Sequence, residues 1–159
     1  MVAKCMHQEW DLDDATAEQR KSDLWINSTI ADIKSFNKAY KEYQNNKEEF
    51  CLAMLDIDDF KMVSDKYGHE KGDEVLKSIS NIVRTEIHES DLAFRYGGEE
   101  ILILFKTNLK RSYKTMNRIL SKAKTIGYSA NFEEFHVTVT AGLSSIEDFK
   151  NYEDAIESA

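Results

Sequence analysis

The stretch RYGGEEILILF, residues 95–105, carries the strongest fold signal in the chain. Two glycines precede two adjacent glutamates, and an apolar run follows at once. The strand-like segments DLAFRY and EEILILF flank the glycines, so we expect a β-hairpin with a two-residue turn at Gly97 and Gly98. Two carboxylates beside such a turn indicate a charged partner that comes close to the backbone.

The segments on either side of this hairpin predict the other elements. Residues 50–58, FCLAMLDID, are apolar on both alternating faces until the aspartates, which is typical of a strand covered by helices. Apolar residues three and four apart predict helices elsewhere. The expected order is a helix from residue 26, a strand (50–58), a short helix ending at Gly68, a helix (72–88), the hairpin, a helix (109–126), a strand (135–145) and a last helix from residue 151. The fold class is therefore α/β or α+β, with a central, mostly antiparallel sheet flanked by helices.

Length and composition indicate one globular domain. The chain has 159 residues, of which 42% are hydrophobic and 31% are charged. We expect residues 1–25 to be a polar extension or linker remnant, and residues 26–159 to form the domain, truncated before the end of its last helix. No apolar run approaches the ~20 residues that cross a bilayer, so we expect no membrane segment in this chain.

Charge and cysteine content narrow the partner and the compartment. A net charge of −8 disfavours nucleic acid as a partner, because its phosphates attract basic proteins. Cys5 and Cys51 do not make a disulfide framework, and Cys51 lies in an apolar run where it is expected to be a core residue. These features favour a cytoplasmic protein.

Asp56 and Asp58 close the predicted strand and share one of its faces, because residues i and i+2 point the same way. Asp56 follows an apolar run, so we expect it to be half-buried and to need a partner for its charge. Carboxylates and backbone carbonyls are the ligands that Mg²⁺ prefers, and we assign Asp56 to a metal. For Asp58 we favour the N-cap of the short helix that follows.

Glu99 and Glu100 point to opposite faces of a regular strand, so only one can meet Asp56 unless the turn re-aims the other. Glu99, beside the glycines, is the expected partner of Asp56. The alternative is an exposed, charged turn, and the apolar run that follows argues against it.

The segment after the strand offers candidates for phosphate and base binding. The amides of Asp59 and Phe60 lie at a helix start, which favours an anion. Lys61 either holds phosphate as a point charge or is a solvated surface lysine. Asp73 is explained either by capping and the helix dipole or by recognition of a guanine base.

Together these motifs resemble the GGDEF family of diguanylate cyclases. The matching stretches are LDIDDFKMVSDKYGHEKGDEVL (55–76), RYGGEE (95–100) and VTVTAGLSS (137–145), within a resemblance over about residues 26–159. It implies a nucleotidyl-cyclase palm-like fold and condensation of two GTP into cyclic di-GMP with release of pyrophosphate. Since each subunit would bring one GTP, it also implies a homodimer with the site at its interface. An attached sensor or regulatory domain is expected in the parent protein.

The resemblance also implies roles for individual residues. Asp56 and Glu99, with the Ile57 carbonyl, would bind Mg²⁺ or Mn²⁺, and Glu100 would assist nearby. The roles toward GTP are phosphate binding by the Asp59 and Phe60 amides and by Lys61, guanine recognition by Asp73, and close approach of the nucleotide at Gly97 and Gly98.

The sequence departs from the family pattern at three positions. Ser64 stands where the family usually has an asparagine that helps to hold guanine, and serine lacks the paired donor and acceptor of an amide. Ile101 replaces the usual phenylalanine, a mild core change. His88 and Asp91 fall on the product-inhibition motif RxxD, and because histidine has no guanidinium we expect feedback inhibition to be weak or absent.

Both ends of the resemblance are also atypical. The chain ends before the segment in which the family carries a further phosphate-binding lysine and arginine, and the upstream segment INSTIADIKSF (26–36) is degenerate. The favoured function is an active diguanylate cyclase, which rests on the carboxylates, Lys61 and Asp73. The alternatives are a degenerate GGDEF domain that binds GTP or dimerises as a regulatory module, which Ser64 favours, and a related cyclase for another nucleotide.

Overall fold

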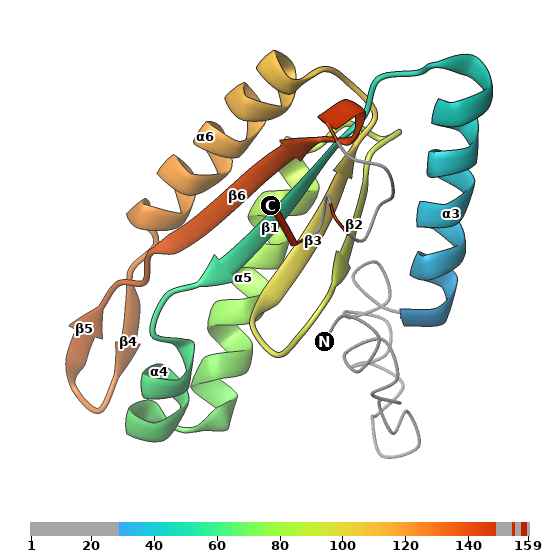
Figure 1. Ribbon diagram of the computed structural model, residues 1–159. Helices are drawn as coiled ribbons and strands as arrows, with labels where there is room; N and C mark the ends of the chain where they lie inside the picture. Colours follow the sequence, from blue (N-terminus) through green and yellow to red (C-terminus); the bar gives the residue numbers. More distant parts are fainter. Residues whose placement is uncertain (1–28, 149–153, 155–156, 159) are drawn as a thin grey trace.

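The structure, a computed structural model, describes residues 29–148, 154 and 157–158 (Figure 1). The predicted extension, residues 1–25, and the start of the predicted last helix lie outside these ranges. Within the described part the elements are α3 (Thr29–Asn46), β1 (Cys51–Ile57), α4 (Phe60–Tyr67), α5 (His69–Glu86), β2 (Leu92–Arg95), β3 (Glu100–Phe105), α6 (Leu109–Thr125), β4 (Tyr128–Ala130), β5 (Glu133–Phe135), β6 (Val139–Ser145) and the 3-10 helix η1 (Ile146–Asp148).

The main sheet has four described strands in the order β2-β3-β1-β6, and every pair is antiparallel. This confirms the expected sheet of mostly antiparallel strands. β1 lies between β3 and β6, and its register places Asp56 opposite Glu100 on one side and opposite Thr140 on the other. The last residues of β1 therefore lie beside the first residues of β3 and β6.

Alternation along β1 explains why both of its faces are apolar. Ala53, Leu55 and Ile57 belong to the core cluster beneath α5 and α6, whereas Leu52 belongs to a second cluster that includes Ala39 of α3. Helices thus cover both faces of the sheet (Figure 1). Each leucine or isoleucine that is fully buried in this way contributes ~1.5–3 kcal/mol to folding.

Several predicted boundaries differ from the structure. The helix predicted over 72–88 is α5 and begins at His69, since Gly68 takes φ 94, which ends α4 and lets α5 start at once. The strand predicted over 135–145 is β6 and begins at Val139. The hairpin is present, but residues 96–99 connect its strands instead of Gly97 and Gly98 alone. The Tyr96 amide donates to the Glu100 carbonyl across this connection at 2.8 Å.

A second, small hairpin of β4 and β5 was not predicted. Its strands have three residues each, and its turn residues Asn131 and Phe132 have φ 53 and 65. Such turns usually contain glycine, so ANFE gives little signal. The Phe135 ring stacks on Tyr67 with 4.3 Å between centroids, which anchors the hairpin to α4.

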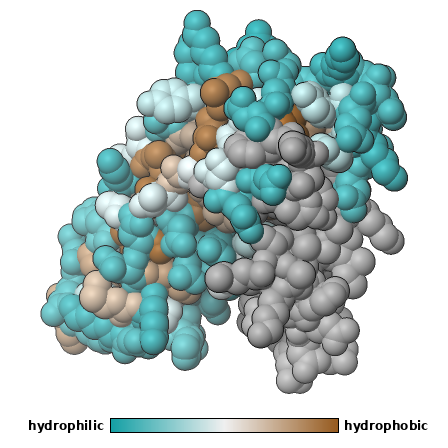
Figure 2. Space-filling view, in the orientation of Figure 1, coloured by the Kyte–Doolittle hydropathy of each residue, from teal (hydrophilic) through white to brown (hydrophobic). Residues whose placement is uncertain are grey.

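Polar residues cover most of the surface in Figure 2, and a hydrophobic band follows β6 and α6. An apolar hollow there is lined by Leu109, Tyr113, Met116, Leu120, Ala141 and Leu143 among others. Leu109 and Tyr113 are exposed, whereas Met116 on the same helix is buried. In the described residues, none of the helices has the length and apolar character that crossing a membrane requires.

Candidate functional site

The residues predicted to meet metal and phosphate gather at one end of the sheet, whereas His88 and Asp91 lie elsewhere. β1 ends there, α4 begins, β6 begins, and the turn between β2 and β3 lies alongside (Figure 1). The loop after β1, the turn between β2 and β3 and the start of β6 are tens of residues apart in the sequence, and the antiparallel register brings them together.

Three carboxylates form the centre of this region. Glu100, the first residue of β3, lies directly opposite Asp56, so it shares a face with Asp56. Glu99 lies in the bend before β3, and its carbonyl accepts a hydrogen bond from the Ile57 amide at 3.4 Å. Strand alternation was expected to make Glu99 the partner of Asp56, but the register shows that alternation favours Glu100 instead. Glu100 is the cross-strand partner, and Glu99 comes close because the bend re-aims it.

The charges of these groups reinforce one another. Burial raises the pKa of Asp56, and the nearby charges of Glu99 and Asp58 raise it further. Burial also raises the pKa of Glu100, followed by the charges of Asp56 and Glu99. Like charges packed at half-buried positions are unfavourable unless a cation joins them.

The carboxylates of Asp56, Glu99 and Glu100 make no hydrogen bond or ion pair within the described structure. They fit a divalent cation for this reason, since half-buried carboxylates need a counter-charge. No set of three acidic, histidine or cysteine side chains in the described ranges is placed to hold an ion by itself. Mg²⁺ does not need such a set, because it commonly takes one or two carboxylates and completes its shell with substrate phosphates and water.

An arginine with no predicted role holds the glycine turn. The Arg95 guanidinium donates to the Gly97 carbonyl (3.1 Å) and to the Gly98 carbonyl (2.9 and 2.6 Å). Neither glycine has a left-handed φ. Gly97 is needed for space, since a Cβ there would collide with the Glu100 carboxylate, whereas a Cβ at Gly98 would meet nothing within 4 Å.

The start of α4 is open to an anion. Asp59 is the residue that caps α4, with φ 55 and ψ 25, and its side chain makes no cap hydrogen bond. The first amides of a helix have no partner within the helix, so they remain available to a phosphate. Lys61, the second residue of α4, is exposed and lines a shallow hollow with Asp59, Met62, Asp65 and Lys66.

Asp58 is not the N-cap that the sequence suggests. Its carboxylate accepts hydrogen bonds from the hydroxyls of Thr138 (2.6 Å) and Thr140 (2.7 Å), and its amide donates to the Thr138 carbonyl at 2.9 Å. The sequence analysis assigned no role to these threonines, although their spacing of two in VTVT places them on one strand face.

Ser64 and Asp73, the candidates for base recognition, lie on α4 and α5 where these helices approach each other. A Cβ at Gly72 would come within 2.5 Å of the Ser64 Oγ, so Gly72 is what lets the helices come this close. Asp73 is exposed and is the fifth residue of α5, whose N-cap is Gly68. Capping therefore does not explain Asp73, which strengthens its functional interpretation.

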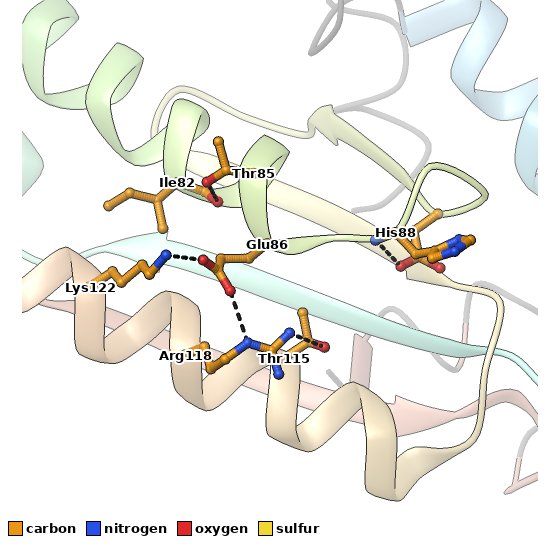
Figure 3. A network of polar contacts seen from close by, with 8 residues as sticks. Ile82, Thr85, Glu86, His88, Thr115, Arg118 and Lys122 are labelled. Atoms are coloured by element: carbon orange, nitrogen blue, oxygen red, sulfur yellow. Dashed lines mark hydrogen bonds and ion pairs between the residues drawn. The ribbon is translucent and has the colours of Figure 1, made fainter.

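The predicted inhibitory site is a closed turn. The Asp91 carboxylate accepts from the amides of His88 and Lys106, both at 2.9 Å, and the His88 Nδ1 lies 2.8 Å from the Ser90 Oγ. Next to this turn, Glu86 of α5 binds Arg118 and Lys122 of α6 (Figure 3). The polar groups of Asp91 thus stabilise the turn.

Comparison with known proteins gives a consistent result. The family model described as "Diguanylate cyclase, GGDEF domain" matches residues 31–159. Diguanylate cyclase DgcS of Shewanella oneidensis is 33% identical over 125 residues, which cover 79% of this chain and 41% of DgcS. Diguanylate cyclase A of Treponema denticola is 31% identical over 115 residues, which cover 71% of this chain and 31% of that protein. The chain therefore spans less than half the length of these relatives.

Solved structures share the fold. Diguanylate cyclase SiaD from Pseudomonas aeruginosa, in complex with its activator SiaC, matches with a TM-score of 0.74 and 31% identity, covering 79% of this chain and 49% of that chain. The GGDEF domain of DgcB from Caulobacter crescentus, in complex with c-di-GMP, matches with a TM-score of 0.76 and 25% identity, covering 80% and 77%. The fold class predicted from the sequence is the one that these structures have.

Proposed function

Because the chain belongs to the GGDEF family of diguanylate cyclases, we propose that it condenses two GTP molecules into cyclic di-GMP and two pyrophosphates. In each half of the reaction the 3′-oxygen of one GTP attacks the α-phosphorus of the other. The bond between the α-phosphorus and the bridging oxygen breaks, and pyrophosphate leaves. Two such steps in opposite directions close the ring.

The observation that carries this proposal is a set of unpaired carboxylates beside an open helix start. Asp56 and Glu99, with the Ile57 carbonyl, would hold Mg²⁺ or Mn²⁺. When bound, the cations activate the 3′-hydroxyl and stabilise the charge that grows on the α-phosphate. The raised pKa of Glu100 suits this carboxylate to accept a proton nearby.

The remaining residues would hold the nucleotide. The amides of Asp59 and Phe60 and the Lys61 side chain would bind the phosphates, and Asp73 would accept hydrogen bonds from the guanine edge. Because Gly97 and Gly98 have no side chains, the nucleotide could lie against the backbone of the turn. Each subunit binds one GTP, so catalysis needs a homodimer in which two sites face each other.

We also propose the setting of this reaction. The matched relatives are more than twice as long as the shared part, which supports a sensor or regulatory domain elsewhere in the parent protein. The described thiol, Cys51, is unpaired and buried, which fits the reducing cytoplasm.

A turnover assay tests the proposal directly. The domain is incubated with GTP and Mg²⁺, and cyclic dinucleotide and pyrophosphate are quantified by chromatography. We expect both products in a ratio of one to two, and we expect Glu99→Gln to reduce turnover at least about a hundredfold. Full turnover in Glu99→Gln would contradict the assignment of Glu99 to the metal. If wild type binds GTP without forming product, the regulatory-module hypothesis would be favoured over the enzyme.

Ser64 is one of the features that favour the regulatory alternative, together with the degenerate upstream segment. An asparagine there would offer the base a paired donor and acceptor, so Ser64→Asn should bind GTP more tightly by about tenfold (1.4 kcal/mol). The measurement is isothermal titration with GTP and, as a control for base recognition, with ATP. An unchanged affinity for GTP would show that position 64 does not select the base.

A further inference from the structure

The loop between β1 and α4 carries most of the proposed contacts to metal and phosphate, yet it contains only two residues. β1 ends at Ile57, and α4 begins at Phe60. Asp59 takes the left-handed conformation, which costs a residue other than glycine ~1–2 kcal/mol. Such a conformation persists only where neighbouring interactions fix it.

Asp58 supplies these interactions through Thr140 of β6 and through Thr138, the residue before this strand. Its amide and its two carboxylate oxygens together make three hydrogen bonds, all to Thr138 and Thr140. After Asp59, the Val63 amide donates to the Asp59 carbonyl at 3.1 Å and begins the helix. The strained residue is thus held between a fixed residue on one side and the first turn of α4 on the other.

The same threonines also decide which aspartate stays available. Thr140 lies opposite Asp56 in the register, but its hydroxyl donates to Asp58. The Asp58 carboxylate is therefore satisfied within the protein, while the Asp56 carboxylate makes no hydrogen bond to any described residue. Of two aspartates on one strand end, separated by a single residue, only Asp58 has side-chain partners among the described residues.

We propose that Asp58 is a positioning residue and that Thr138 and Thr140 are its anchors, so that β6 sets the geometry of the loop that meets metal and phosphate. Three hydrogen bonds hold Asp58 in place. They therefore fix the peptide group between Ile57 and Asp58, and with it the direction in which the Asp59 and Phe60 amides point. This role deepens the proposed cyclase function and rests on it. Asp58 and the threonines touch neither the cation nor the nucleotide.

The test removes the two hydroxyls and keeps the shape of the side chains. We compare Thr138→Val/Thr140→Val with Thr138→Ser/Thr140→Ser, which keeps both donors. In the valine pair we expect a rise of about tenfold in KM for GTP and a fall of about tenfold in kcat, each of which corresponds to 1.4 kcal/mol. The serine pair should return both constants to within about threefold of the wild type, since its hydroxyls can still donate. Thr125→Val is the matched control, because its hydroxyl bonds only the Lys122 carbonyl within α6.

A second readout needs neither metal nor turnover. Amide hydrogen exchange of residues 58–63 in the free protein should be faster in the valine pair and unchanged in the serine pair and in Thr125→Val. If the valine pair fails to fold, the single variant Thr140→Val is measured instead, with the same expected direction. Unchanged exchange and unchanged KM in a folded valine variant would overturn the positioning role.

The two proposals fail in different ways. If wild type makes no cyclic dinucleotide but its loop loosens in the valine pair, the cyclase proposal fails and the positioning role stands for nucleotide binding, measured with a fluorescent GTP analogue. If wild type is active and the valine pair equals it in KM, kcat and exchange, only the positioning role fails.

Discussion

At the scale of single residues, the carboxylates at the end of β1 bear on both stability and activity. Asp56 and Glu100 face each other across two strands with raised pKa values, and the described structure offers them no counter-charge. Functional sites often keep such unfavourable contacts because a ligand relieves them. The cluster should therefore weaken the empty protein at neutral pH.

We predict that, without divalent cations, the free energy of unfolding falls as pH rises from about 4 through the raised pKa values of Asp56 and Glu100. The pKa of each group is higher in the folded state, so the folded state binds more protons in this window and ionisation costs stability. Urea unfolding across this range measures the effect. Asp56→Asn should be more stable than wild type by about 0.5 kcal/mol near pH 7, where the half-exposed charges are partly screened, and equal to it below about pH 4.

The two glycines of the turn should respond differently to alanine. Gly97→Ala pushes the Glu100 carboxylate aside, and because the end of a flexible side chain moves easily, we expect a loss of stability under about 1 kcal/mol. Turnover should fall about tenfold or more, since the carboxylate proposed to act in catalysis has moved. Gly98→Ala has open space and serves as the matched variant. It should leave kcat unchanged and raise KM if the nucleotide lies on the turn. Equal effects on kcat in both variants would contradict this account.

At the scale of elements, a buried carboxylate joins α5 to α6. The Glu86 side chain is 9% exposed, whereas those of Arg118 and Lys122 are 53% and 57% exposed (Figure 3). Lys122 and then Arg118 lower the pKa of Glu86. Glu86 lies at the C-terminal end of its own helix, where the helix dipole disfavours a negative charge, so its stabilisation comes from α6.

Glu86→Gln should therefore lower the free energy of unfolding at pH 7 by roughly 1–2 kcal/mol, because hydrogen bonds to a charged group are lost. Since the folded-state pKa is lowered, this contribution is present above the ordinary carboxyl pKa and is lost as pH falls through the folded value. Chemical denaturation at neutral and acidic pH measures both parts. Lys124→Gln, an exposed lysine on the same helix, is the control and should change little. If Glu86→Gln lowers the free energy of unfolding at low pH as well, packing and not charge would be responsible.

The closed turn at 88–91 leads to a prediction about regulation. The Asp91 oxygens are engaged by the His88 and Lys106 amides, and histidine offers no guanidinium to a ligand. The initial rate of cyclisation should therefore stay unchanged when cyclic di-GMP is added at concentrations well above those that the assay itself forms. His88→Arg is the comparison variant, and a wild type as strongly inhibited as that variant would contradict the prediction.

At the scale of the whole molecule, the proposed reaction would need two copies of the chain. If each protomer binds one GTP as proposed, the rate per protomer should rise in proportion to protein concentration below the dissociation constant of the dimer and level off above it. Initial rates over a dilution series, with analytical ultracentrifugation of the same samples, measure this dependence. A constant rate per protomer in a sample that sediments as a monomer would exclude a site shared between subunits.

The same scale separates what the sequence can predict from what it cannot. The buried run of β1 and the apolar stripe of α5 follow from local periodicity, so these elements were predicted correctly, whereas the β4–β5 hairpin, which lacks such a pattern, was missed. The partners of Asp58 lie 80 and 82 residues away, and no local pattern links them. The contrast between Glu99 and Glu100 failed for a related reason, because it depends on where β3 begins. That boundary is set by the backbone hydrogen bond from the Tyr96 amide to the Glu100 carbonyl, not by the side chain of either glutamate.

The left-handed backbone of Asp59 also constrains how this chain can drift over generations. Glycine adopts φ near 55 freely, and asparagine and aspartate adopt it more readily than most other residues, although Lys47 and Phe132 also have a positive φ in this chain. In the genetic code, both asparagine and glycine are one nucleotide change from aspartate. Neutral change at position 59 should therefore favour these three residues, two of which are uncharged. A lineage that loses this negative charge keeps the loop, and its site faces incoming phosphates with one less repulsive group.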